Sequence, residues 1–433
     1  MFGQMIQQIQ NADTFSLTGK IENIVGMSIE ASGGNAAVGD ICRIYNGDTG
    51  DQVTAEVVGF KNDRILLMPY SDMSGISAGN FVRNTGRQLT LPMGPFLRGR
   101  IINALGQPID GGAPFESGFS HCVEGKYINP LSRPAITERM EFGIKAIDGL
   151  LTIGKGQRIG IFAGSGVGKS TLMGMIAKNV KADINVIALV GERGREVLDF
   201  VRKDLGDEGM ARSILVVATS DQPAMLRKKC PSVATGIAEY FRDQGYDVLL
   251  MMDSLTRFAM AQREIGLAVG EPPVARGYTP SIYAELPKLL ERSGNFEKGS
   301  ITGVYTVLVE GDDTNEPISD TVRGILDGHI VLSRRLAAAN HYPAIDVGAS
   351  ISRLMTDIVP LESRRAAGRI RDIMSIYEKS SDLVSIGAYK AGTNPKLDYA
   401  LGKIDAIDTF LKQDVDESFS YEETVEQMEQ ILH

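Results

Sequence analysis

The segment RIGIFAGSGVGKST at residues 158–171 has the residue types and spacing needed to bind a chain of phosphates. An apolar strand is followed by a glycine-rich turn and the start of a helix, which is the context that such a loop requires. There the backbone N–H groups and the helix N-terminus attract phosphate oxygens, Lys169 reaches the β- and γ-phosphates, and the Ser170 hydroxyl ligates Mg²⁺. The residues expected to contact the phosphates are Gly164, Ser165, Gly166, Val167, Gly168, Lys169, Ser170 and Thr171.

One position of this loop departs from the strict pattern GxxxxGK[ST], which has glycine where this chain has Ala163. Alanine is tolerated at that position only if its φ angle is negative. Gly164, Gly166 and Gly168 leave the rest of the turn free to adopt the conformations that a phosphate loop needs. The alternative, an accidental glycine-rich turn, does not explain the flanking strand and helix.

Two further strand ends are expected to bring carboxylates to the same place. The run VLLMMDS at 248–254 ends in Asp253, which would emerge at the carboxyl edge of a sheet and hold the Mg²⁺ shell. The run VIALVGERGRE at 186–196 places Glu192 after a second strand, where it can polarise a water that attacks the γ-phosphate. The structural alternatives are a helix cap for Asp253 and a salt bridge to a neighbouring arginine for Glu192. No pocket for a second substrate can be identified, so phosphoryl transfer to water is favoured.

The pattern of the whole chain predicts four parts. Residues 1–14 have the apolar spacing of a short amphipathic helix. Residues 15–90 contain short β-rich runs separated by glycine-rich turns, which predicts a small β-barrel. Residues 91–355 alternate apolar strand-like runs with amphipathic helical segments, the pattern of an α/β domain around a parallel sheet. Residues 356–433 show helical spacing and predict a C-terminal helical domain.

Composition limits the classes of function. A net charge of -9 and a pI near 5.2 argue against a protein held to nucleic acid by broad electrostatics. Cys42, Cys122 and Cys230 are widely spaced and form no CxxC pair, so neither a disulfide framework nor a zinc site is indicated. No signal peptide and no apolar run of membrane-spanning length is visible. We therefore expect a cytoplasmic protein that reaches a membrane assembly only through partners.

Several segments, taken in order, closely resemble one protein family: AGSGVGKST, GERGREV, LLMMDSLTRFA, GEPPVARGYTPSIY and HYPAIDVGASISR. This family contains the rotary ATP synthase subunits and the ATPases of flagellar and type III protein export, and the likeness spans about residues 20–430. PAIDVGASIS matches the signature segment of the family. Two segments are typical of the flagellar or type III secretion ATPases: KAIDGLLTIGKGQRIGIFAGSGVGKST and ELPKLLERSG. The sequence of a third segment, LRGRIINALGQPIDG, favours the flagellar ATPases.

The resemblance implies a RecA-like P-loop ATPase core with an N-terminal β-barrel and a C-terminal helical domain, assembled as a homohexameric ring. It also implies hydrolysis of ATP with Mg²⁺ at the subunit interfaces, which energises protein export. Carried over by position, Lys169 and Ser170 bind phosphate and Mg²⁺, and Asp253 supports the metal. Glu192 activates water, and Arg193 approaches the γ-phosphate.

Two residues downstream complete the set that the resemblance implies. Tyr342 matches the position whose ring stacks on adenine, and Arg353 matches the arginine finger that enters the site of the neighbouring subunit. The plainer alternatives are a core aromatic residue for Tyr342 and a surface salt bridge for Arg353. If the resemblance holds, the two residues serve different active sites.

The resemblance also implies partners. Residues 266–278 correspond to a loop at the central pore where a coiled-coil stalk protein docks, unless they form an ordinary surface loop. The helix expected at 1–14 resembles the segment that holds a stator-like regulatory protein, unless it folds back on the barrel. Export gate membrane proteins, export substrates and chaperones are the other expected partners. The acidic segment 414–432 is interpreted as a solvated helix face or, alternatively, a docking surface.

Three other functions remain open from the sequence. One is a subunit of a rotary ion-translocating ATPase, and another is a non-catalytic nucleotide-binding subunit, which Glu192 disfavours. The third is a hexameric RNA translocase, whose barrel would need exposed aromatic residues among basic ones. Residues 16–50 offer one tyrosine and few cations, so no nucleic-acid partner is expected. The sequence does not distinguish a flagellar from an injectisome apparatus with certainty.

Overall fold

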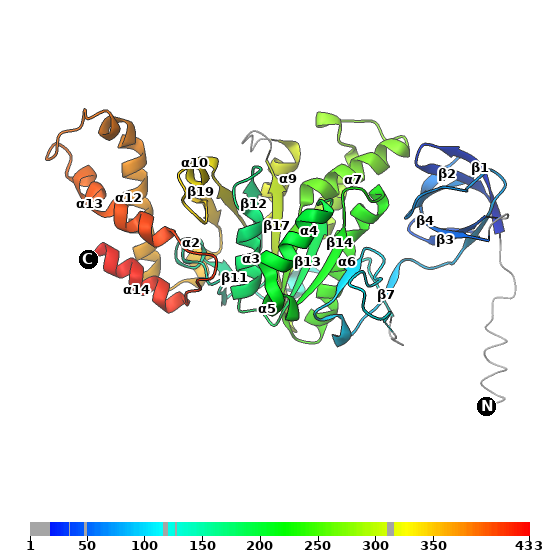
Figure 1. Ribbon diagram of the computed structural model, residues 1–433, viewed down its shortest axis with the longest axis horizontal. Helices are drawn as coiled ribbons and strands as arrows, with labels where there is room; N and C mark the ends of the chain where they lie inside the picture. Colours follow the sequence, from blue (N-terminus) through cyan, green and yellow to red (C-terminus); the bar gives the residue numbers. More distant parts are fainter. Residues whose placement is uncertain (1–17, 34, 47–49, 116–119, 126–127, 310–315) are drawn as a thin grey trace.

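The computed structural model describes residues 18–33, 35–46, 50–115, 120–125, 128–309 and 316–433. The helix expected at 1–14 lies outside this part of the chain. In Figure 1 the described chain is elongated, with a β-barrel at one end, a large sheet in the middle and a group of helices at the other end. None of the helices in the described ranges is both long enough and apolar enough to cross a membrane.

Six strands near the N-terminus close into a barrel in the order β1-β2-β5-β4-β3-β6. Their side chains alternate between the inside and solvent, as in β3, where Cys42 and Ile44 are buried and Arg43 is exposed. Closure leaves no unpaired edge strand. The barrel expected in this part of the chain is confirmed, whereas its exact boundaries stay a prediction. The strands are β1 (Thr18–Val25), β2 (Ser28–Ser32), β3 (Ile41–Tyr45), β4 (Gln52–Lys61), β5 (Arg64–Pro69) and β6 (Phe81–Asn84).

The central sheet has nine strands in the described chain, in the order β19-β18-β12-β17-β15-β13-β14-β8, with β16 paired to β17. All neighbours on the main path are parallel except β18 and β19. Since both faces of a parallel sheet are covered, its strands are continuous apolar runs, and every residue of β13 is buried. The strands are β8 (Ile101–Asn103), β12 (Arg158–Ala163), β13 (Ile184–Val190), β14 (Ser213–Ala218), β15 (Asp247–Asp253), β16 (Gly294–Asn295), β17 (Ser300–Leu308), β18 (Gly328–Leu332) and β19 (Ile345–Ser352).

Helices cover both faces of this sheet (Figure 1). Alternate residues of β13 therefore belong to different apolar cores: Val186 lies in the core that contains α6 and α7, and Ile187 lies in the core that contains α3 and residues of the C-terminal helices. The helices of the central domain are α2 (Lys145–Leu150), α3 (Lys169–Asn179), α4 (Gly194–Asp199), α5 (Gly206–Ala211), α6 (Ala224–Asp243), α7 (Leu255–Ala268), α8 (Pro280–Leu290), α9 (Pro317–Ile325) and α10 (Arg334–Ala338). A π-helical segment, Phe200–Leu205, joins α4 to α5. Smaller elements are β7 (Thr90–Pro92), β9 (Ser120–Cys122), β10 (Arg139–Met140) and β11 (Ile153–Gly154), with 3-10 turns at Pro95–Leu97, Pro130–Ser132 and Ala275–Gly277.

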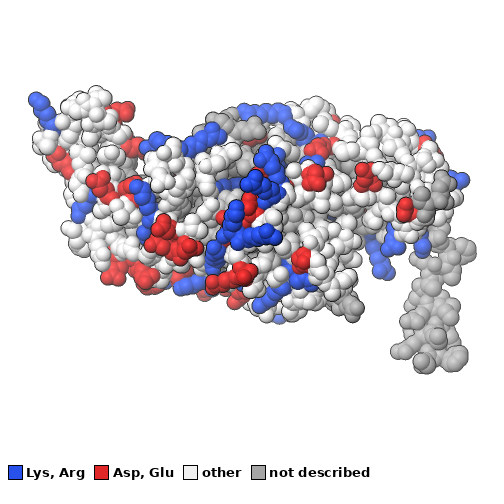
Figure 2. All heavy atoms as spheres, viewed as in Figure 1, with Lys and Arg blue, Asp and Glu red and all other residues white. Residues whose placement is uncertain are grey.

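The C-terminal domain is helical, as the sequence predicts. After the short α11 (Met355–Ile358) come α12 (Leu361–Ser385), α13 (Pro395–Leu411) and α14 (Tyr421–Leu432). A new helix, α13, begins here because Asn394 caps its N-terminus with its side chain and Pro395 occupies its first helical position. The acidic residues of α14 lie on its exposed face, and Figure 2 shows acidic side chains gathered over this domain.

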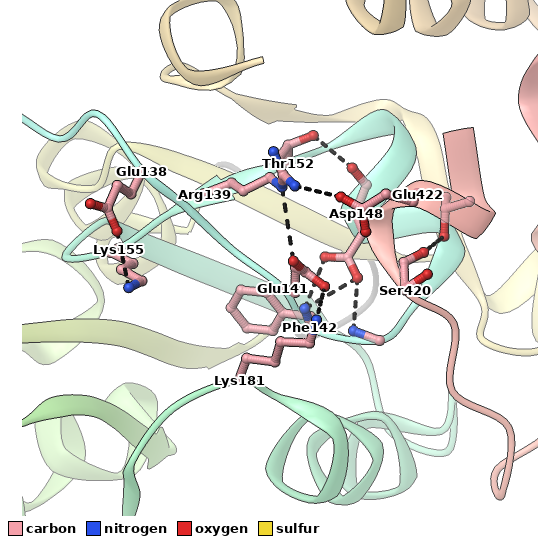
Figure 3. A network of polar contacts seen from close by, with 12 residues as sticks. Glu138, Arg139, Glu141, Phe142, Asp148, Thr152, Lys155, Lys181, Ser420 and Glu422 are labelled. Atoms are coloured by element: carbon pink, nitrogen blue, oxygen red, sulfur yellow. Dashed lines mark hydrogen bonds and ion pairs between the residues drawn. The ribbon is translucent and has the colours of Figure 1, made fainter. Parts of the chain in front are cut away.

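A polar network joins α14 to the first residues of the central domain, as Figure 3 shows. Arg139 of β10 donates to Glu422 at 2.7 Å and lies over the ring of Tyr421, 4.0 Å from its centroid. Nearby, the buried carboxylate of Asp148 accepts backbone N–H groups of Phe142, Gly143 and Ile144 at 2.7 to 3.3 Å. Burial raises the pKa of Asp148 to about 7, and these hydrogen bonds oppose the rise.

The barrel is joined to the central domain by a buried group of charges. Lys229 of α6 is 4% exposed and contacts Glu56 of β4 at 2.8 Å and Glu124 at 2.7 Å. The Tyr70 hydroxyl donates to the same Glu56 oxygen, Oε2, that Lys229 contacts. An ion pair removed from water in this way is costly to break, because the remaining partner is left buried and uncompensated.

We expect Lys229→Ala to destabilise the protein by about 3 kcal/mol, since Glu56 would remain buried without its cation. The measurement is the midpoint of the first unfolding transition in urea. Lys288→Ala is the control, because Lys288 pairs with Glu285 on the surface with its side chain 71% exposed, and should change stability by less than about 0.5 kcal/mol. Equal effects of the two substitutions would show that the buried cluster does not hold the barrel in place.

Candidate nucleotide site

The phosphate loop follows β12 directly, as the sequence predicts. Ala163 is the last residue of this strand, so its backbone is extended and its side chain is tolerated, which explains the departure from the strict motif. Gly166 and Gly168 have φ angles of 78° and 85°, a region that favours glycine. A Cβ atom at Gly164 would lie 2.8 Å from Nε of Arg334, so a larger residue there would require this flexible side chain to move. The loop ends at Lys169, where α3 begins, and Ser170 is exposed in the first turn of this helix.

The expected lysine and both expected carboxylates meet at this edge of the sheet. Lys169 donates to the Asp253 carboxylate, and its Nζ atom lies 3.8 Å from Oε1 of Glu192. Thr306 of β17 donates to the same Asp253 oxygen at 2.7 Å. The three charged side chains are mostly buried, with exposures of 12%, 6% and 14% for Lys169, Asp253 and Glu192. They come together because β12, β17, β15 and β13 are consecutive in the sheet and parallel.

The charge of Glu192 is affected by its surroundings. Burial is the largest cause of a rise in its pKa to about 8, the nearby Asp253 carboxylate adds to the rise, and Lys169 opposes it. Glu196 of α4 also contributes, and a hydrogen bond between the two carboxyl groups lowers the pKa of Glu196. These shifts favour the protonated form of the Glu192 carboxyl group, which donates a hydrogen bond to Glu196.

Arg193 does not point at the phosphate loop in this structure. It caps α4, its side chain is 80% exposed, and its guanidinium pairs with Glu196 at 3.2 Å. Arg195 and Lys203 nearby are also exposed, at 90% and 72%. Figure 2 shows Lys and Arg side chains gathered over this part of the central domain. The spacing of three residues allows this pair on a helix, so the sequence does contain a signal for it.

A pocket of about 520 Å³ lies beside the phosphate loop. The ring of Tyr342 forms one wall, 41% exposed and so close to Gly168 that a Cβ atom there would be 3.3 Å from the ring. The Tyr342 side chain thus lines a pocket and is not a fully buried core aromatic. Another part of the wall comes from the C-terminal domain, which sequence reasoning missed because no local motif marks it. The lining residues are Gly168, Thr171, Leu172, Met175, Asn340, Tyr342, Pro343, Lys412, Gln413, Asp414 and Val415.

Arg353 lies at the other edge of the sheet. Strand β19 runs antiparallel to β18, with Ile345 opposite Leu332 at the loop edge and Ser352 opposite Gly328 at the far edge. Gly328 and Leu332 are four residues apart on β18, so the two edges are separated by about 13 Å at about 3.3 Å per residue. The Arg353 N–H donates to the Asp327 carbonyl at 3.0 Å, and the Arg353 side chain is exposed. Within the described residues its guanidinium makes no hydrogen bond or ion pair, so the surface salt bridge is not formed here.

The sheet order, the glycine-rich loop ending in Lys169 and the carboxylates at neighbouring strand ends define a P-loop nucleotide-binding protein. Comparison with protein families agrees. Residues 143–352 match the ATP synthase alpha/beta family nucleotide-binding domain, and residues 21–86 match the beta-barrel domain of that family. Residues 359–430 match the T3SS EscN ATPase C-terminal domain.

Close relatives cover nearly the whole chain. It is 54% identical to a flagellum-specific ATP synthase of Bacillus subtilis (strain 168), with 97% of this chain and 96% of the relative covered. It is 50% identical to a type 3 secretion system ATPase of Xanthomonas euvesicatoria, with coverage of 94% and 92%. A solved structure of the assembled ATPase EscN from the type III secretion system of enteropathogenic E. coli superposes with a TM-score of 0.91 at 45% identity, covering 96% of this chain and 100% of that one.

The chain therefore belongs to the ATP synthase alpha/beta family, within the group of flagellum-specific ATP synthases and type 3 secretion system ATPases, and is an ATPase. The predicted fold class, an α/β RecA-like P-loop core with an N-terminal β-barrel and a C-terminal helical domain, is confirmed. These comparisons do not favour a rotary ion pump subunit or an RNA translocase. The roles of individual site residues stay predictions.

We expect Glu196→Gln to shift the acidic limb of the pH profile of kcat/KM to lower pH. This profile reports the essential groups of the free enzyme, and the limb of the unmodified enzyme should lie near the Glu192 pKa of about 8. Removal of the Glu196 charge makes the ionised form of Glu192 less unfavourable, so its pKa falls. Glu426→Gln on the exposed face of α14 is the control. An unchanged limb in Glu196→Gln would mean that Glu192 is not the titrating group.

Proposed function

We propose that this protein hydrolyses ATP at the interfaces between subunits of a homohexamer, and that this hydrolysis energises protein export through a flagellar or type III secretion apparatus. One observation carries the proposal: Tyr342 and Arg353 lie at opposite ends of β19, one beside the phosphate loop and one at the far edge of the sheet. Arg353 lies far from the loop of its own subunit, so its exposed guanidinium serves the next one. The close relatives named for flagella and type 3 secretion support the export role.

The substrate position follows from the pocket and the loop. The adenine ring stacks on Tyr342, the phosphates follow the loop from Gly164 to Gly168, and Lys169 binds the β- and γ-phosphates. The Ser170 hydroxyl and the Asp253 carboxylate are oxygen ligands of the kind that Mg²⁺ prefers, and would hold it beside the phosphates. A bound Mg²⁺ ion would neutralise charge on the β- and γ-phosphates.

Glu192 is the general base. Its carboxylate takes the proton of the attacking water, and a pKa close to the working pH is suited to this task. Arg193 leaves Glu196 and turns toward the γ-phosphate when nucleotide is present. Arg353 of the neighbouring subunit adds positive charge to the transferred phosphoryl group, as arginine fingers do.

The proposed partners are those that membership of this family implies. A solved structure of EscN includes its central stalk EscO, which supports a coiled-coil stalk partner for this chain. We assign its contact to residues 266–278, where Leu267 and Val274 are exposed apolar side chains. A stator-like regulatory protein would bind residues 1–14. Export gate membrane proteins, export substrates and chaperones complete the set, with the protein in the cytoplasm at the membrane-bound apparatus.

Shared sites predict complementation between two inactive proteins. Arg353→Ala should lower turnover by about 10³-fold with little change in nucleotide affinity, since an arginine finger acts on the transition state. Glu192→Gln should also be inactive. Mixing equal amounts of the Arg353→Ala and Glu192→Gln proteins should restore activity at roughly one interface in four, where an intact Glu192 meets an intact Arg353.

The measurement is steady-state ATPase activity of the two proteins alone and mixed, with Arg335→Ala as a control for loss of an exposed arginine (side chain 71% exposed). A mixture that stays inactive, or an Arg353→Ala protein with normal turnover, would contradict a site shared between subunits.

The export role predicts a specific loss in cells. A Lys169→Ala replacement should prevent secretion of the proteins that build the extracellular filament, because the lysine binds the phosphates. ATP-driven ion uptake by membrane vesicles from the same cells should be unchanged. Immunodetection of filament proteins in the medium measures the first effect. Normal secretion with reduced ion uptake would instead support the rotary ion-translocating ATPase.

A further inference from the structure

Gln413 occupies an unusual position between the two walls of the pocket beside the phosphate loop. It follows α13 in the C-terminal domain and is only 5% exposed. Its neighbours Lys412, Asp414 and Val415 line the same pocket as Tyr342. A buried glutamine is costly unless its amide is hydrogen-bonded.

Every polar group of the Gln413 side chain is used. The side-chain oxygen accepts the Lys145 N–H at 3.0 Å, and the side-chain nitrogen donates to the carbonyls of Gly143 at 2.8 Å and Glu417 at 2.9 Å. The Gln413 backbone N–H donates to the Tyr342 carbonyl at 3.0 Å. One residue thus connects the segment before α2, the loop that carries Tyr342 and the turn after α13.

A second contact holds the same loop to α13. His341 precedes Tyr342, is 4% exposed and pairs with Asp408 of α13 at 2.8 Å. Both walls of the pocket are therefore fixed to each other by polar contacts between the central and C-terminal domains. The apolar side chains Ile407 and Phe410 pack α13 against the central domain independently of these contacts.

We propose that Gln413 is the positioning residue of the base pocket. Its amide holds the turn at residues 412–415 at a fixed spacing from the Tyr342 ring, so that a nucleotide base is enclosed between the two. All hydrogen bonds of the amide are made within the chain, so the amide does not contact the base. It affects base binding by fixing the positions of the pocket walls. This inference rests on the proposed function, which places the base against Tyr342.

The test is Gln413→Met, which keeps the length of the side chain and removes the amide. The KM for ATP should rise about tenfold while kcat stays within about twofold, because enclosure of the base contributes to binding and not to the chemical step. Inorganic tripolyphosphate, which has no base, should inhibit this variant and the unmodified enzyme with the same constant. Gln430→Met, at an exposed position of α14, is the matched control and should leave all three values unchanged.

Two further variants make the result decisive. Gln413→Glu keeps the acceptor for the Lys145 N–H but places a carboxyl oxygen against the Gly143 and Glu417 carbonyls, so it should raise the KM for ATP at least as much, and it is a second variant if Gln413→Met does not fold. Tyr342→Ala should raise the KM for ATP without affecting tripolyphosphate. Equal weakening of ATP and tripolyphosphate by the Gln413 variants, or no change in either, would overturn the positioning role. If Tyr342→Ala leaves the KM for ATP unchanged, the proposed placement of the base is itself wrong.

Discussion

The buried contact between Lys169 and Asp253 is the constraint around which the site is built. One ammonium group faces two carboxylates, Asp253 and Glu192, in a place largely shielded from water. With both carboxylates ionised the group would carry a net negative charge, which burial makes costly. The proton on Glu192 removes that charge, and Glu196 accepts the resulting hydrogen bond. Lys169, Asp253 and the protonated Glu192 together are therefore electrically balanced, and phosphates that attract Lys169 would change this balance.

The sheet supplies this arrangement, and it could be predicted from the sequence. Parallel strands deliver their last residues to one edge, so an apolar run ending in Asp253 or followed by Glu192 already places each carboxylate. The glycine-rich loop could also be found from the sequence, because its residues are contiguous. The part of the pocket wall that follows α13 could not be predicted, because Tyr342 and Val415 are far apart in the chain and are brought to one pocket by the packing and the polar contacts of the C-terminal domain. The ion pair between Arg193 and Glu196 depends on side-chain orientation within one turn of helix, which residue type does not determine.

The signature segment PAIDVGASIS has a structural basis in the irregularity of β19. Val331 pairs with Asp346 and His329 with Ile351, so that β19 bulges between these two pairs. The bulge is held by its own polar contacts: the Ala349 N–H donates to the Asp346 carboxylate at 3.0 Å, and the Val331 N–H donates to the Ser350 hydroxyl at 2.9 Å. Hydroxyl and carboxylate side chains thus replace ladder hydrogen bonds that the extra residues would interrupt. This requirement explains why small and short polar residues occupy the segment.

Strand β19 connects the C-terminal domain to the rest of the central domain. Its first end is tied to the C-terminal domain through the Tyr342 carbonyl and Gln413, and its second end is tied to the central domain through Arg353 and Asp327. Asp327 also pairs with Arg158 at the start of β12, the strand that leads into the phosphate loop. A displacement of the Tyr342 loop when the pocket fills would therefore act on the helical domain directly. Its effect on Arg353 would pass through a bulged strand hydrogen-bonded to β18. The path along the chain from Tyr342 to Arg353 is short, so β19 would link one site physically to the next if Arg353 acts on the neighbouring subunit as proposed.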